Sequence, residues 1–166
     1  DALVVDLRQN GGGHLSELVL EKLARRIRAT SVNRHAPAET WPNAAPRGPL
    51  VALTNQWAGS DGDIGTSMFR ALGLGPVVGT RTWGGIIGID GRYSLVDGTG
   101  VTQPRYAFWM LEEGWGIENH GVDPDVEVAI PPDAWGRGED PQLDTGVRLA
   151  LEALAAAAPV PQPDPA

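Results

Sequence analysis

Two apolar runs, each followed by a glycine-rich turn and then by a helical pattern, constrain this fold more than any other feature. The first run, Ala2 to Asp6, ends near "NGGG" at Asn10 to Gly13, and the second, Leu50 to Thr54, ends near "AGSDG". Runs of about five apolar residues that stop at turn residues are typical of buried strands. A parallel strand reached through a helix makes a right-handed crossover. The sequence therefore predicts an α/β fold.

The helical patterns complete these crossovers. A first helix is predicted after residue 14, and a second over residues 62–72, where Gly73 supplies a C-terminal stop. Residues 29–48, rich in Ala, Pro and Asn, are predicted to be a long loop, and residues 77–78 a third strand. The first helix is expected to bury the apolar residues that recur at helical spacing, which are Leu15, Leu18, Val19, Leu23 and Ile27.

The second half of the chain is predicted to be mostly β structure. Residues 92–109 alternate well enough for two strands joined through "DGTG", and residues 126–130 form a last strand. A final helix is expected to start after Asp140, a good N-cap, and to bury Leu143, Val147, Leu151 and Leu154. We expect one α/β domain over residues 1–158, with strand–helix crossovers and an added β section, and a disordered Pro-rich tail over 159–166.

Composition excludes several function classes. The 166 residues carry a formal charge of −8, so the surface repels nucleic acid, and without cysteine the chain has no disulfide or thiolate metal site. No run approaches the roughly 18 apolar residues of a membrane span. "DGDIG" resembles a calcium loop, but Gly65 stands where a third ligand is needed, so Asp61 and Asp63 are interpreted as first-turn helix acids. We expect no cofactor and no metal.

The "AGSDG" turn holds the first candidate catalytic residue. It differs from the G-x-S-x-G elbow in having Ala58 at the first glycine. Such an elbow exposes the serine oxygen and aims the next N–H, here that of Asp61, at a developing oxyanion. Serine is also a favoured helix cap, so the residues alone leave Ser60 open as a nucleophile or as a cap.

A second oxyanion donor should come from another strand-to-helix loop. "NGGG" is a loop of that kind, and its glycines let the backbone approach a substrate carbonyl closely. The loop lacks the Lys-Ser/Thr ending of a phosphate-binding loop, which argues against a nucleotide site.

A nucleophilic serine needs a general base, and the chain offers few. Lys22, the single lysine, is expected to be solvated on the first helix, and His14 and His35 to lie on the surface. His120, two residues after Glu118 in a glycine-flanked segment, is the candidate retained.

Four long motifs together resemble a known family. "DLRQNGGG", "TNQWAGSDGDIG", "GLGPVVGTRTWGGIIG" and "WGIENHGVDPDVE" resemble, in order and almost without gaps, the C-terminal catalytic domain of tricorn-type proteases, within the carboxy-terminal-processing-like serine peptidases. The resemblance runs from about Asp1 to Ala155 and implies a ClpP/crotonase-like core.

The resemblance also implies roles for individual residues. Ser60 matches the nucleophile, the N–H groups of Gly13 and Asp61 match the oxyanion hole, and Glu118 matches the glutamate of a Ser-His-Ser-Glu tetrad. The histidine and second serine of that tetrad precede this region in the family and match no residue here. Because the chain also enters directly on a strand, we expect it to be the C-terminal part of a longer catalytic domain, folded but inactive when isolated.

Two departures limit what the resemblance transfers. Related Ser-Lys processing proteases carry a lysine in a stretch like "TRTWGG", where Gly85 stands here, so that mechanism is not expected. The acidic residue with which the family favours basic side chains lies in the loop that matches residues 29–38, which contain no acid. The side-chain preference before the cleaved bond therefore stays open.

The resemblance implies a cytoplasmic serine endopeptidase that cleaves oligopeptides through an acyl-enzyme and assembles as a homo-hexamer, without nucleic-acid or membrane partners. The alternative is a non-catalytic module on the same fold that holds a peptide or an apolar ligand. Trp83, Trp109 and Trp115 could line such a cleft, although we expect them to pack in the core.

Overall fold

A four-stranded parallel sheet forms the centre of the computed structural model, which describes residues 1–161. Its strands lie in the order β1 (Leu3–Asp6), β4 (Leu50–Thr54), β5 (Val77–Gly79) and β8 (Val126–Glu127). The predicted α/β class is confirmed, although the last strand is shorter than expected. Residues 162–166, within the tail predicted to be disordered, lie outside the described residues.

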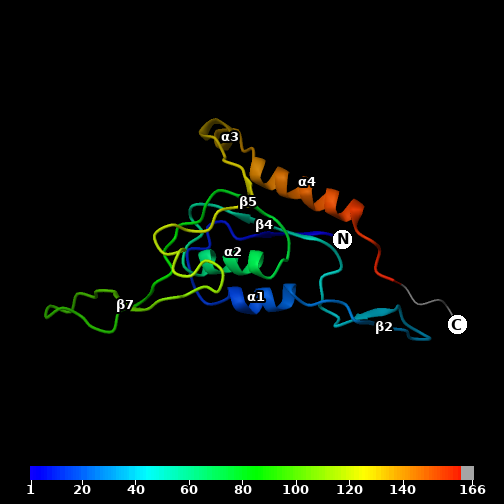
Figure 1. Cartoon of the computed structure of the whole chain (residues 1–166), viewed down its shortest axis with the longest axis horizontal. Coiled ribbons are helices and arrows are strands. Elements are labelled where there is room, and N and C mark those ends of the chain that lie inside the picture. Colours follow the sequence, from blue (N-terminus) through cyan, green and yellow to red (C-terminus); the bar gives the residue numbers. More distant parts are fainter. Residues whose placement is uncertain (162–166) are drawn as a thin grey trace.

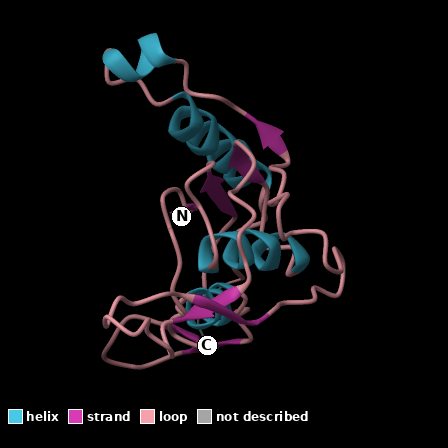
Figure 2. Ribbon diagram, turned by 90° about the vertical axis from the view of Figure 1, so that its left-hand side faces the viewer, coloured by secondary structure: helices cyan, strands magenta, loops and turns pink. Residues whose placement is uncertain are grey.

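Helices cover both faces of this sheet. Helix α2 (Asp61–Ala71) packs on one face with α1 (Ser16–Leu23) outside it, and α4 (Pro141–Ala156) packs on the other (Figures 1 and 2). Central strand β4 is buried throughout, with Leu50 and Ala52 in the core under α1 and α2, and Val51 and Leu53 in the core under α4. A parallel strand covered on both faces is apolar at every position, which explains the unbroken "LVAL" run.

Helix α4 has the predicted N-cap but turns a different face to the sheet. Asp140 accepts a hydrogen bond from Leu143 N at 3.0 Å, as an N-cap does. Gly146 and Ala150 are buried, whereas Leu143, Val147 and Leu151 are exposed, so the predicted buried face is wrong. A Cβ on Gly146 would lie 2.7 Å from Leu53 Cδ2. The small residues therefore allow close contact with the sheet, and the leucines point outward.

Helix α1 is also shorter and more exposed than predicted. It ends at Leu23 instead of continuing to Ile27, because Arg28 N donates to Trp41 O and leads into a hairpin. Leu20 is its one buried residue and packs with Phe69 of α2. Because α1 packs mainly on α2 and reaches the core under the sheet chiefly through Leu20, it buries a narrow stripe and leaves Leu18 53% exposed.

Two hairpins extend from the layered core. Strands β2 (Ala29–Ser31) and β3 (Glu39–Trp41) pair within the segment predicted to be a loop, which corrects that prediction. Strands β6 (Gly88–Asp90) and β7 (Gln103–Tyr106) form a hairpin whose chain turns at the predicted "DGTG", where Leu95 N donates to Thr99 O. The second strand lies within the predicted range 92–109, but the first precedes it, and next to the turn only an isolated bridge joins Ser94 to Gly100. A short helix, α3 (Pro132–Gly136), precedes α4. Among residues 1–161, no helix is long and apolar enough to cross a membrane.

Candidate active site

Ser60 lies in the turn between β4 and α2, where the backbone adopts a rare conformation. Its φ of 52° and ψ of −110° fall in a region that residues with a side chain seldom occupy. Such conformations cost about 1–3 kcal/mol and persist only where the surroundings impose them. Two bonds hold the turn from either side: Gly59 N donates to Asn10 O at 2.9 Å, and Trp83 N donates to Ala58 O at 2.9 Å.

The glycine loop predicted to face Ser60 lies directly against it. A Cβ on Gly12 would lie 3.2 Å from Ser60 Cβ and 3.5 Å from Ser60 Oγ. Gly12 N is occupied, because it donates to Asn10 Oδ1 at 3.2 Å. The N–H groups of Gly13 and Asp61, by contrast, have no acceptor among residues 1–161. These are the two groups predicted to receive an oxyanion.

Asp61 does more than supply a backbone N–H. Its side chain is buried and accepts hydrogen bonds from Ser16 Oγ at 2.5 Å and Ser16 N at 3.2 Å, with longer contacts to Leu15 N and Asn10 Nδ2. It therefore joins the start of α2 to the start of α1. The glycine loop, which lies between Asn10 and Leu15, is fixed at both of its ends.

Asp63 binds on the opposite side of the elbow. Its fully buried carboxylate accepts hydrogen bonds from Ser60 N at 2.8 Å, Gly84 N at 2.8 Å and Gly85 N at 3.1 Å. The sequence interpretation of both aspartates as first-turn helix acids is right about their position. It missed that each carboxylate binds backbone N–H groups of another segment.

Glu118 lies next to the same loop. Its Oε2 accepts from Ile86 N at 2.8 Å and Ile87 N at 3.0 Å. Within residues 1–161 no hydrogen bond reaches Oε1. One carboxylate oxygen thus fixes the backbone, and the other is left for a further partner.

None of the three histidines is hydrogen-bonded to Ser60 within the described part of the chain. His35 lies in the β2–β3 hairpin and His14 at the end of the glycine loop, both exposed. His120 Nε2 lies 3.4 Å from Asp123 Oδ2. Asp123 also binds Arg81, and hydrogen bonds from Arg81 and His120 outweigh burial and lower the pKa of Asp123. His120 therefore pairs with a surface carboxylate.

Exposed aromatic and apolar groups surround the elbow. Trp83 is 66% exposed, with its ring against Gly59 and Gly85, and Trp109 and Trp115 are also more than half exposed, so the expected core packing of these tryptophans is wrong. An apolar groove of about 950 Å³ runs between α1 and α2. It begins near the elbow at Ser16 and Ile64 and is closed on one side by Phe108 to Glu112.

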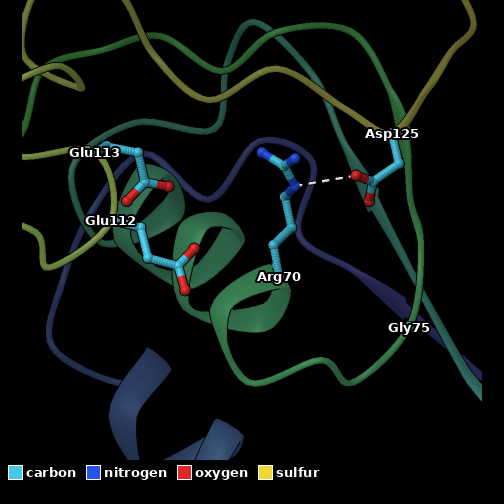
Figure 3. A pocket seen from close by; sticks show the side chains of 5 residues that line it. All are labelled: Arg70, Gly75, Glu112, Glu113 and Asp125. Carbon is cyan, nitrogen blue, oxygen red and sulfur yellow. Dashed lines mark hydrogen bonds and ion pairs between the residues drawn. The ribbon is translucent and has the colours of Figure 1, made fainter.

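A second, polar pocket of about 460 Å³ lies near the other end of α2 (Figure 3). Arg70 occupies it and donates from Nε to Asp125 Oδ1 at 3.1 Å, while Glu112 and Glu113 extend from the opposite wall. Nowhere in residues 1–161 do three or more His, Cys, Asp or Glu side chains form a group that could hold a metal ion. This pocket is separate from the elbow.

Comparison with known proteins identifies the class to which this fold and elbow belong. The family model of Peptidase family S41 matches residues 1–128, and the chain belongs to that family. Tricorn protease homolog 1 of Streptomyces coelicolor is 60% identical over 93% of this chain, and the tricorn protease of Thermoplasma acidophilum is 46% identical over 92%. The resemblance drawn from the four motifs is confirmed.

The solved structures agree with the sequence relatives. The crystal structure of the tricorn protease superimposes with a TM-score of 0.89 at 45% identity and covers 93% of this chain. The chain spans 14% of the length of the two curated relatives and 15% of that solved chain. The photosystem II D1 C-terminal processing protease is more distant, with a TM-score of 0.51 and 26% identity over 81% of this chain.

Proposed function

We propose that this chain carries the nucleophile of a serine peptidase that hydrolyses peptide bonds of oligopeptides through an acyl-enzyme. Ser60 Oγ adds to the substrate carbonyl, and the N–H groups of Gly13 and Asp61 stabilise the resulting oxyanion. The observation that carries the proposal is the strained Ser60 backbone, which lies against Gly12. The N–H groups of the next residue along each segment, Asp61 and Gly13, have no acceptor among residues 1–161. Removing one such donor typically slows catalysis by about 100- to 1000-fold.

The general base comes from outside these 166 residues in this proposal. Lys22 lies on α1, His120 pairs with Asp123, and within residues 1–161 neither His14 nor His35 is hydrogen-bonded to Ser60. We therefore assign the proton of Ser60 to none of them. A histidine upstream of Asp1 would accept that proton. Glu118 Oε1 would then polarise or orient the catalytic group that this histidine forms with Ser60.

The apolar groove between α1 and α2 supports a peptide as the substrate. It opens one helical turn from Ser60, since Ile64 N donates to Ser60 O at 3.0 Å and the side chain of Ile64 lines the groove. An apolar substrate side chain would bind there. Cytoplasmic location and assembly into a homo-oligomer, a hexamer by resemblance to tricorn, form part of the same proposal.

Labelling with a fluorophosphonate, which reacts with activated serines, tests the proposal. The protein expressed with its native upstream sequence should be labelled rapidly, and Ser60→Ala should abolish both labelling and peptide hydrolysis. Ser67→Ala, on the same helix but hydrogen-bonded to Glu113, is the matched control and should keep both. Labelling that survives Ser60→Ala would contradict the nucleophile assignment.

The bare 166-residue chain separates the remaining alternatives. It should be labelled slowly, because the base is missing, and rapid labelling would contradict an external base. A longer protein that binds peptides but is never labelled would favour the non-catalytic binding module.

A further inference from the structure

Four successive backbone N–H groups, from Gly84 to Ile87, donate to just two carboxylates. The first two bind Asp63 and the next two bind Glu118 Oε2, at distances of 2.8 to 3.1 Å. Asp63 also accepts from the N–H of Ser60 itself, at 2.8 Å. The segment 84–87, here called the strap, thus connects the backbone of the serine to the side chain of Glu118.

Asp63 is an unusual residue to bury at this position. Its side chain is fully buried, and within residues 1–161 no arginine, lysine or histidine forms an ion pair with it. A buried carboxylate without a cation is costly unless several donors compensate it. Three backbone N–H groups and the N-terminal end of α2 provide this compensation. The chain therefore has a buried carboxylate at a position where an apolar side chain would avoid this desolvation cost.

The far side of the strap is fixed without Asp63. Asn119 N donates to Gly84 O at 2.7 Å, and Thr82 and Val122 exchange two bonds, at 3.1 and 2.7 Å. Gly84 has a φ of +83°, and a Cβ there would lie 2.4 Å from Gly121 N, so the contact with the 117–122 turn is close. On the elbow side the described bonds are those of Asp63 and the single bond from Trp83 N to Ala58 O.

We propose that Asp63 is a positioning residue that sets the distance between Ser60 and Glu118. The inference rests on the proposed function, because the separation matters only if both groups serve one reaction. With Asp63 in place, the strained Ser60 backbone and the Glu118 carboxylate are held by opposite ends of one four-residue segment. Without its charge, the strap moves relative to the elbow, and the substrate still binds while the reacting groups lose their alignment.

The test is Asp63→Asn in the protein expressed with its native upstream sequence. Asparagine has nearly the same shape but replaces one acceptor oxygen with a donor. Because misplacement of about 1 Å can slow a reaction about 100-fold, kcat should fall by about that factor while KM changes less than about threefold. Ser67→Ala, also buried in α2, is the control and should lower thermal stability while kcat stays within about twofold.

A double-mutant cycle with Glu118→Gln distinguishes positioning from a general loss of stability. If Asp63 acts through the strap on Glu118, the double variant should lose much less than the product of the two single losses. A fully multiplicative loss, or a kcat for Asp63→Asn equal to that of Ser67→Ala, would overturn the inference. If Asp63→Asn does not fold, Asp63→Ser, which removes the charge without adding an amide donor, is judged by the same criteria.

The proposed function fails in a different way. If Ser60→Ala remains active, the nucleophile assignment is wrong whatever Asp63 does. If Ser60→Ala is inactive but Asp63→Asn is normal, the inference alone is wrong.

Discussion

The elbow and the β6–β7 hairpin both depend on carboxylates, but in opposite surroundings. At the elbow Asp61 and Asp63 are buried, and every bond they make ends on a group of another segment or on the serine backbone. In the hairpin Asp90 pairs with Arg105 at 2.8 Å and Arg92 at 3.7 Å, and both arginine side chains are at least half exposed. One region is held by buried polar bonds, the other by surface ion pairs.

This difference shows that the elbow is held more rigidly than the hairpin. Charge-assisted hydrogen bonds strengthen as water is excluded, whereas exposed ion pairs contribute about 0–1 kcal/mol because solvent screens them. The elbow should therefore lose much stability when a carboxylate is neutralised. The hairpin should lose little, and α4, whose cap is partly buried, should fall between them.

Asp61→Asn should give the largest effect. The amide keeps the shape but turns a donor toward Ser16, so bonds to a charged acceptor are lost and a buried group is left unpaired. We expect the free energy of unfolding of the 166-residue chain to fall by about 2–3 kcal/mol, measured by urea denaturation. Asp144→Asn, an exposed first-turn aspartate of α4, is the matched control and should change it by less than about 0.5 kcal/mol. Equal losses in the two variants would remove the contrast.

Asp140→Asn should give an intermediate, pH-dependent effect. Burial acts to raise the pKa of Asp140, but hydrogen bonds from Leu143 N and the Arg8 guanidinium outweigh it, so the pKa lies below its usual value. A depressed folded-state pKa means that the stabilisation is present above the unfolded pKa of about 3.9 and is lost as pH falls through the folded value.

The measurement is the free energy of unfolding between pH 7 and pH 2.5. The wild-type chain should exceed Asp140→Asn by about 1 kcal/mol at pH 7, since asparagine keeps the cap but loses the ion pair with Arg8. The two curves should converge below pH 4. A difference that persisted at pH 2.5 would show that the cap itself, and not the charge, is responsible.

The strand core was predictable from sequence because a buried parallel strand has one simple signature. Unbroken apolar runs that end at glycine turns identified β1, β4 and β5, and the Asp140-Pro141 pair identified the start of α4. The buried faces of α1 and α4 were not predictable by apolar periodicity. In α4 the contact is made by Gly146 and Ala150, because close packing on the sheet selects small side chains.

The geometry of the candidate site was predictable only where a residue's own chemistry marks it. The serine turn and the glycine loop stand out because they combine a hydroxyl side chain with flexible backbone. The carboxylates of Asp61 and Asp63 looked like ordinary first-turn acids, since their partners Ser16 and Gly84 are distant in sequence and appear only in the fold. The signal that could have found them is two acids one and three residues after the serine, in a helix start that must be buried.

Asp90→Ala should give the smallest loss of stability. It tests the exposed half of the comparison between the elbow and the β6–β7 hairpin. Both of its ion pairs lie on the surface of the hairpin, so urea denaturation of the 166-residue chain should show a loss of less than about 0.5 kcal/mol. Arg105→Ala should lose about as much, because it removes the shorter of the two pairs, at 2.8 Å, and keeps only the 3.7 Å pair with Arg92. A loss above about 1 kcal/mol in either variant would mean that this pair is shielded from water. The hairpin would then be held as firmly as the elbow, and burial would no longer separate the two regions.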